Sequence, residues 1–155
     1  MDEQKLNFVM KEYLPLLKNL QTETTGNWGK MNAQQMVEHV ATFFNVSAGN
    51  IKFELVTPVE YLPKYREFLF SDKEFRENTK APTNVIGEEA LPLRFASMDE
   101  ALENLTKSIT AFENYFKEDA EKITLHPVFG ELNFEEWVLL HYKHVMHHAR
   151  QFGLM

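Results

Sequence analysis

The sequence has no cysteine, no cluster of basic residues and no long apolar run, and each absence removes a class of protein. Without cysteine there is no disulfide, no thiolate metal site and no cysteine nucleophile. Lysine and arginine form no run, and the formal net charge is −7. Nucleic acids and anionic membrane surfaces are bound by clustered cations, so we expect neither as a partner. No apolar run approaches the ~20 residues that cross a bilayer.

The first residues also lack the basic and apolar regions of a signal peptide, so we expect a cytoplasmic protein. What the chain does contain is material for a core. Hydrophobic residues make up 44% of its 155 residues, and 13 residues are phenylalanine. This length and composition predict one domain over residues 1–155.

Four segments have the periodicity of amphipathic helices, at about residues 3–20, 32–48, 97–116 and 133–153. Pro15 lies inside the first, which predicts a kink or an early end near Leu14. The other three begin with capping-box pairs, Asn32 with Gln35, Ser97 with Glu100 and Asn133 with Glu136. Gly153 is a natural end for the last helix. The pattern predicts an all-α fold.

Residues 49–96 form a long connection that is interrupted by Pro58, Pro63, Pro82 and Pro92. We predict one short helix at 61–70 and ordered loop elsewhere, with Glu88 and Glu89 solvated. A connection of this length can cross the whole bundle, so the second and third helices need not be antiparallel neighbours. Its aromatic residues could form a homodimer interface or could cover the bundle, and the sequence leaves both open: Tyr61, Tyr65, Phe68 and Phe70.

Histidines concentrate in the last helix, where four of the six fall within eight positions, His141, His144, His147 and His148. His144 and His148 are four residues apart, so they lie one above the other on a helix and could bind one transition metal. The best third ligand is His39, on the apolar face of the second helix. Ligands need partners for their other ring nitrogen, and candidates are His141 and, as second-shell residues, Glu38, Gln151 and His147. Trp137 lies on the same helical arc and would line the pocket.

Each of these residues also has a simpler interpretation. A single histidine on an apolar face is more often a hydrogen-bonded core residue than a ligand, and histidine pairs occur on surfaces. His141 and His147 taken singly fit pocket or surface positions, His126 fits a loop, and Trp137 fits the core. No Glu-x-x-His motif occurs on two helices, which argues against a di-iron carboxylate site.

Two stretches resemble one branch of the DinB-like superfamily. The first is Trp28–His39, and the second is His126–Leu132 followed by Trp137 and His141–Gly153. The resemblance implies a four-helix bundle of up-down-down-up topology with a long crossover between helices two and three. It also implies a three-histidine site for a divalent metal, Zn or Ni with Fe or Cu as further options. Matched by position, the ligands are His39, His144 and His148.

Some DinB-like relatives transfer groups to or from a low-molecular-weight thiol, so our first hypothesis is a metal-dependent enzyme of small molecules that performs thiol S-transfer or hydrolysis. Because this chain has no cysteine, the thiol would arrive as a cofactor. His141 is the first candidate for a general base and His126 a weaker one. The alternatives are a non-catalytic, metal-stabilised bundle or stress-related binding module, and a metal-free protonatable histidine cluster.

Overall fold

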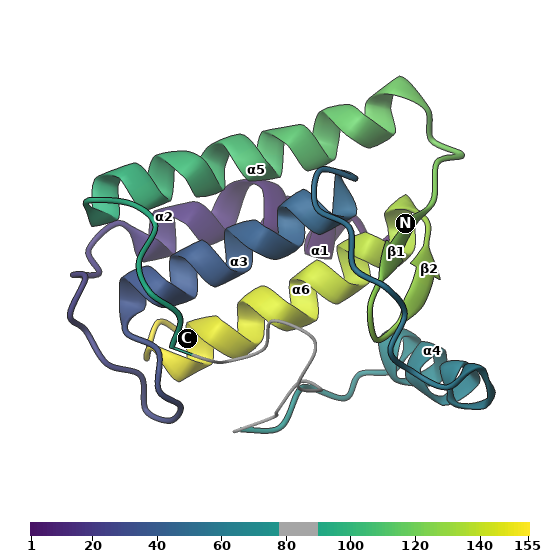
Figure 1. The fold of residues 1–155 in the computed structure, drawn as a ribbon, viewed down its shortest axis with the longest axis horizontal. Helices are drawn as coiled ribbons and strands as arrows, with labels where there is room; N and C mark the ends of the chain where they lie inside the picture. Colours follow the sequence, from purple (N-terminus) through teal and green to yellow (C-terminus); the bar gives the residue numbers. More distant parts are fainter. Residues whose placement is uncertain (78–89) are drawn as a thin grey trace.

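A computed structural model describes residues 1–77 and 90–155, and the fold is mostly helical (Figure 1). Its helices and strands, in chain order, are α1 (Glu3–Asn7), the π-helix η1 (Phe8–Glu12), α2 (Tyr13–Leu17), α3 (Ala33–Ser47), the 3-10 turn η2 (Val59–Tyr61), α4 (Leu62–Phe70), α5 (Met98–Glu118), β1 (Thr124–His126), β2 (Gly130–Leu132) and α6 (Phe134–Gln151). Among the described residues, no helix has the length and apolar character needed to cross a membrane.

The first helical segment continues past Leu14, near which the sequence predicted a kink or an early end. Pro15 lies within α2, which runs to Leu17, so of these two alternatives the early end is wrong. A proline clashes with the carbonyl four residues earlier and cannot bond to it. Just before Pro15 the chain forms the π-helix η1, in which Tyr13 N–H bonds to the carbonyl of Phe8. This wider turn accommodates the proline without ending the helix.

The predicted helix starts are confirmed, although only one capping box is complete. At α3, Asn32 accepts from the Gln35 amide at 2.9 Å, and the Gln35 side chain accepts from the Asn32 amide at 2.8 Å. Ser97 and Asn133 cap α5 and α6 in the same way, but the reciprocal bonds are absent there. The Glu100 carboxylate accepts from Ala96 N–H, and that of Glu136 pairs with Arg66.

The helix α3 lies between α5 and α6, and all three run along the long axis of the molecule (Figure 1). It is therefore buried on nearly every side, including Phe44, whose ring packs edge-on against Phe112 of α5. The amphipathic helix predicted at 97–116 is α5, and its apolar face is turned to this core. Leu102 on that face is partly exposed, and the following apolar residues are buried, Leu105, Ile109, Phe112 and Phe116. The arrangement places one face of α3 directly against α6.

A short antiparallel hairpin, β1–β2, precedes α6, so the all-α expectation is corrected to a helical fold with a small two-stranded sheet. His126, expected in a loop, ends β1 and pairs with Gly130, whose φ of 84° suits glycine. Strands of three residues carry too little alternation to be recognised in a sequence. The connection after α3 packs on the turn, where Val56 N–H bonds to the Pro127 carbonyl.

The predicted short helix in the long connection is confirmed as α4, preceded by η2. Tyr61, Tyr65 and Phe70 on this segment are exposed, whereas Phe68 packs against Phe75 and Phe129. The expectations for Pro82 and for the pair at 88–89 lie outside the described residues.

Candidate metal centre

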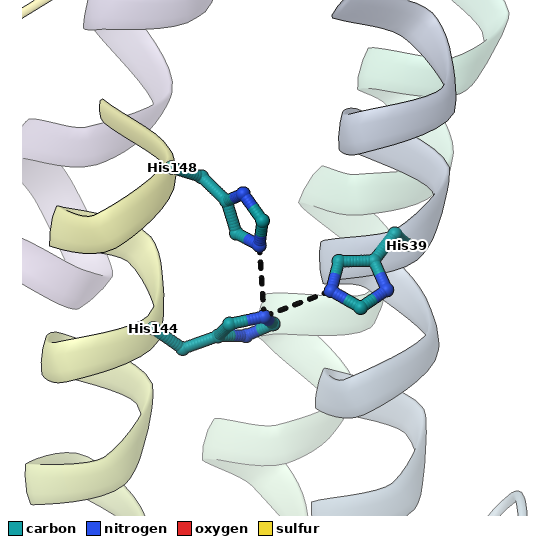
Figure 2. Close-up of side chains that lie close together, drawn as sticks. All are labelled: His39, His144 and His148. Atoms are coloured by element: carbon teal, nitrogen blue, oxygen red, sulfur yellow. Dashed lines mark hydrogen bonds between the residues drawn. The ribbon is translucent and has the colours of Figure 1, made fainter. Parts of the chain in front are cut away.

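Three histidines from two helices meet between α3 and α6. Figure 2 shows His39 from α3 and His144 and His148 from α6 with their rings pointing toward one another. Nε2 of His144 lies 2.9 Å from Nε2 of His39 and 3.0 Å from Nε2 of His148. The spacing of four residues on α6 and the close contact of α6 with α3 bring these nitrogens to one point.

The chemistry of this donor set fits a cation. A neutral imidazole nitrogen carries either a proton or a lone pair, so a single Nε2 of His144 cannot donate to one neighbour and accept from another. Burial and the nearby histidines hold the pKa of His39 and of His144 well below the usual value, which keeps both rings neutral. Neutral imidazole is the form that binds a divalent metal, and nitrogens bound to one ion at about 2 Å would lie about this far apart.

Gln151 sets the protonation pattern of His148. Its Oε1 lies 2.6 Å from Nδ1 of His148, and its Nε2 donates to the Trp28 carbonyl at 2.9 Å. The bond to Trp28 fixes which end of the amide is oxygen, so Nδ1 of His148 must carry the proton and donate. Nε2 of His148 is then left with a lone pair toward the other two rings.

The loop before α3 reaches this pair by a close backbone approach. Asn27 N–H bonds to the Gln151 carbonyl at 2.7 Å. A Cβ at Gly26 would lie 2.9 Å from both Cγ of Gln151 and the Trp28 carbonyl oxygen. Only glycine leaves room for this contact, so Gly26 helps position Gln151. Sequence reasoning missed both Gly26 and the role of the Trp28 carbonyl, because backbone contacts over such a separation leave no residue pattern.

Glu38 bonds to the long connection and not to a ring nitrogen of the triad. Its carboxylate accepts from Arg94 N–H at 2.8 Å and from Gln34 Nε2 at 3.1 Å. The Arg94 guanidinium donates back to the Glu38 carbonyl and to Thr42. Nδ1 of His39 is one of the buried atoms without a hydrogen-bond partner in the described part of the chain.

Two further histidines of α6 were candidates for the site, and one of them, His147, contacts the triad. His147 is buried, with its ring edge against Trp28 and against His148. The ring of His141 is stacked between those of Phe44 and Trp137, with centroid distances of 3.9 and 5.3 Å. Its Nε2 lies 2.8 Å from Ser47 Oγ.

These contacts make His141 a core residue by its surroundings, and burial lowers its pKa well below the usual value. Trp137 is fully buried beside it. Ser47, its hydrogen-bond partner, was not singled out in the sequence, because a serine near the end of a helix is common.

His126 lies on the other side of Phe43 from the triad. Its ring is stacked on Phe43 at 5.5 Å, and the Phe43 ring contacts His39 and His144 edge-on at 5.4 and 5.5 Å. Its Nδ1 accepts from the backbone amides of Val128 and Phe129. Burial lowers its pKa to about 3.

Access to the triad is uneven. His39 and His148 are buried, whereas His144 is partly exposed. The triad therefore extends from the buried interior to the partly exposed residue His144.

Comparisons with known proteins identify the superfamily of this chain. Comparison with curated proteins and with solved structures found no significant match. The sequence model of the DinB superfamily matches residues 6–152, which include all three histidines of the triad. Because this match covers nearly its whole length, the chain belongs to the DinB superfamily.

Proposed function

We propose that this protein is a divalent-metal-dependent enzyme that acts on a small molecule, by thiol S-transfer or by hydrolysis. The observation that supports it most is the convergence of three Nε2 atoms from two helices, with one ligand partly exposed. Three protein ligands leave a fourth position of a tetrahedral ion for water or substrate, which is the pattern of catalytic sites.

A metal in this site would lower the pKa of a bound water or thiol and so supply the nucleophile. His39, His144 and His148 would hold it, and Gln151 would orient His148. Zn and Ni suit three imidazoles, as do Fe and Cu. With no cysteine in the chain, a thiol would be a second small-molecule reactant.

The general-base roles of His141 and His126 stay predictions, and the contacts of both rings weigh against them. Nε2 of His141 is engaged with Ser47, and Nδ1 of His126 with two backbone amides. A base must have a free lone pair within reach of the proton that it takes. We therefore place more weight on metal-bound water or thiolate as the group that reacts.

We also propose the up-down-down-up four-helix arrangement for the N-terminal helical segment, α3, α5 and α6, with the long connection as its crossover. A cytoplasmic location and a homodimer through the exposed aromatic residues of α4 are further proposals. Size exclusion of the purified protein tests the dimer directly.

A non-catalytic, metal-stabilised module is the second candidate function, because two of the three ligands are buried and the site joins α3 to α6. In that case a fourth protein ligand would close the site. The two candidates differ in whether an added small ligand can bind to the ion.

Elemental analysis of untagged protein tests the proposal, with wild type beside His144→Ala. We expect near-stoichiometric metal in the wild type and its loss in the variant, with the helical circular dichroism signal retained. Glu135→Ala is the matched control, since Glu135 is an exposed residue on the same helix and pairs with the N-terminus, away from the triad. No metal in the wild type, and none taken up from added Zn or Ni, would overturn the proposal.

A further inference from the structure

The side chain of His126 has one fixed tautomer. Its Nδ1 accepts two hydrogen bonds, from Val128 N–H at 3.0 Å and from Phe129 N–H at 3.2 Å. A nitrogen that accepts carries no proton, so the single proton of the neutral ring is on Nε2. The lowered pKa agrees with a ring that stays neutral at physiological pH.

Nε2–H of His126 is a donor without a partner in the described part of the chain. Three buried side-chain atoms there lack a hydrogen bond, one each in Trp28, His39 and Trp137. Nε2 of His126 has no hydrogen-bond partner among the described residues either, and the residue as a whole is 9% exposed.

One aromatic ring separates this donor from the metal ligands. The ring of His126 stacks on the ring of Phe43, with 25° between the two planes. The Phe43 ring in turn makes edge-on contacts with the rings of His39 and His144. The centroid of the Phe43 ring lies 5.5 Å from that of His126 and 5.4 Å from that of His39, so a molecule held at the triad would reach His126 by extending past this one ring.

We propose that Nε2–H of His126 binds an oxygen acceptor, a carboxylate or a carbonyl, on the molecule held at the metal. The inference rests on the proposed function, because it assumes an ion at the triad. In this role His126 donates a hydrogen bond to the substrate and does not act as a general base. The favoured substrates would then carry an oxygen acceptor at a fixed distance from the atom bound to the metal. A role in the turn alone would need Nδ1 and would not need Nε2.

The test uses Co²⁺-loaded protein and mercaptoacetate with its longer ω-mercaptocarboxylate homologues, each beside the alkanethiol of the same length. Thiolate binding is followed by the sulfur-to-cobalt absorption. We expect the wild type to prefer the carboxylate at one chain length by roughly tenfold or more, the value of a hydrogen bond to a charged group.

Two substitutions separate the nitrogens of the ring. His126→Asn keeps an acceptor near the place of Nδ1, but its shorter side chain has no N–H at the position of Nε2, so the preference should disappear. His126→Gln can place an N–H near Nε2 and should restore part of it. The tautomer itself is read from ¹⁵N chemical shifts of the wild type, where we expect Nε2–H.

Equal preference in the wild type and in His126→Asn would overturn the inference, as would a wild type without preference or a ring protonated on Nδ1. If Co²⁺ is not bound at all, the proposed function fails, and the inference fails with it. If Co²⁺ and alkanethiols bind normally while the carboxylate gives no advantage, only the role of His126 is wrong.

Discussion

At the scale of single residues, the amide of Gln151 controls which nitrogen of His148 can bind a cation. The Trp28 carbonyl holds the amide nitrogen, so the amide oxygen faces Nδ1 of His148. Without that partner the ring could turn or adopt the other tautomer, and its Nε2 would no longer be a constant ligand. Replacing such a partner of a metal-bound histidine typically costs roughly 10–100-fold in metal affinity.

Replacing Gln151 should therefore weaken metal binding while leaving the triad intact. For Gln151→Met we expect a loss of roughly 10–100-fold in Zn affinity, measured by competition with a chelator. Glu38→Gln is the control, since Glu38 bonds to Arg94 and Gln34 and to no triad nitrogen. An equal loss in both variants would mean that Glu38 acts on the ligands and that our interpretation of its contacts is wrong.

His126 should make stability depend on pH. Its pKa is about 3 in the folded protein and about 6.5 in an unfolded chain, so between these values the unfolded chain binds the additional proton. Stability must then fall as the pH falls through this window. From pH 7 to pH 5 the contribution of His126 is about 2 kcal/mol.

The measurement is urea unfolding of metal-free protein at the two pH values. Between pH 7 and pH 5, the free energy of unfolding of His126→Asn should fall by about 2 kcal/mol less than that of the wild type. The comparison isolates His126 from His39, His141 and His144, whose pKa values are lowered in the same direction. Parallel losses in the two proteins would contradict the account.

At the scale of elements, α4 is attached to α6 by charged groups as well as by packing. Arg66 pairs with Glu136 through two bonds, of 2.6 and 2.9 Å, and the carboxylate is buried while the guanidinium is half exposed. Lys143 Nζ donates to the Ser71 carbonyl just after the end of α4. These contacts hold α4 against α6.

Removing the pair should loosen α4 and leave the rest of the fold unchanged. For Glu136→Gln we expect a loss of about 1–3 kcal/mol, because the guanidinium keeps its charge and loses a buried partner. Hydrogen exchange should accelerate at the amides of α4. Glu103→Gln removes an exposed pair on α5 and should change neither quantity measurably. Unchanged exchange in α4 would show that packing alone attaches it.

Elements with local signals were predictable, and those that depend on distant contacts were not. The cap residues Asn32, Ser97 and Asn133 gave the three helix starts, because capping acts within four residues. The π-helix before Pro15 and the hairpin at His126 were missed. The first is a response to a clash, and the second consists of strands that are too short to show a pattern.

At the scale of the molecule, the triad joins two helices that are distant in sequence. His144 and His148 could be paired from their spacing, His39 was the best third ligand from its place on the apolar face of the second helix, and the resemblance to the family implied the same three residues. The positions of Gln151 and His126 relative to the triad needed the fold, since one depends on the loop at Gly26 and the other on the hairpin.

A metal held by both helices should stabilise the whole fold. At a free concentration about a hundredfold above the dissociation constant, it would add about 2.7 kcal/mol, or roughly 5–10 °C in Tm for a domain of this size. Differential scanning calorimetry with and without Zn should show this shift in the wild type. The shift should be absent in His39→Ala, and a similar shift in that variant would place the ion elsewhere.

The most direct test of the metal centre is X-ray absorption at the zinc edge of the loaded protein. The account predicts three imidazole nitrogens at about 2.0–2.1 Å and one further oxygen, which is replaced by sulfur when a thiol is added. A zinc ion with four protein ligands, or with fewer than three imidazoles, would contradict an open three-histidine site.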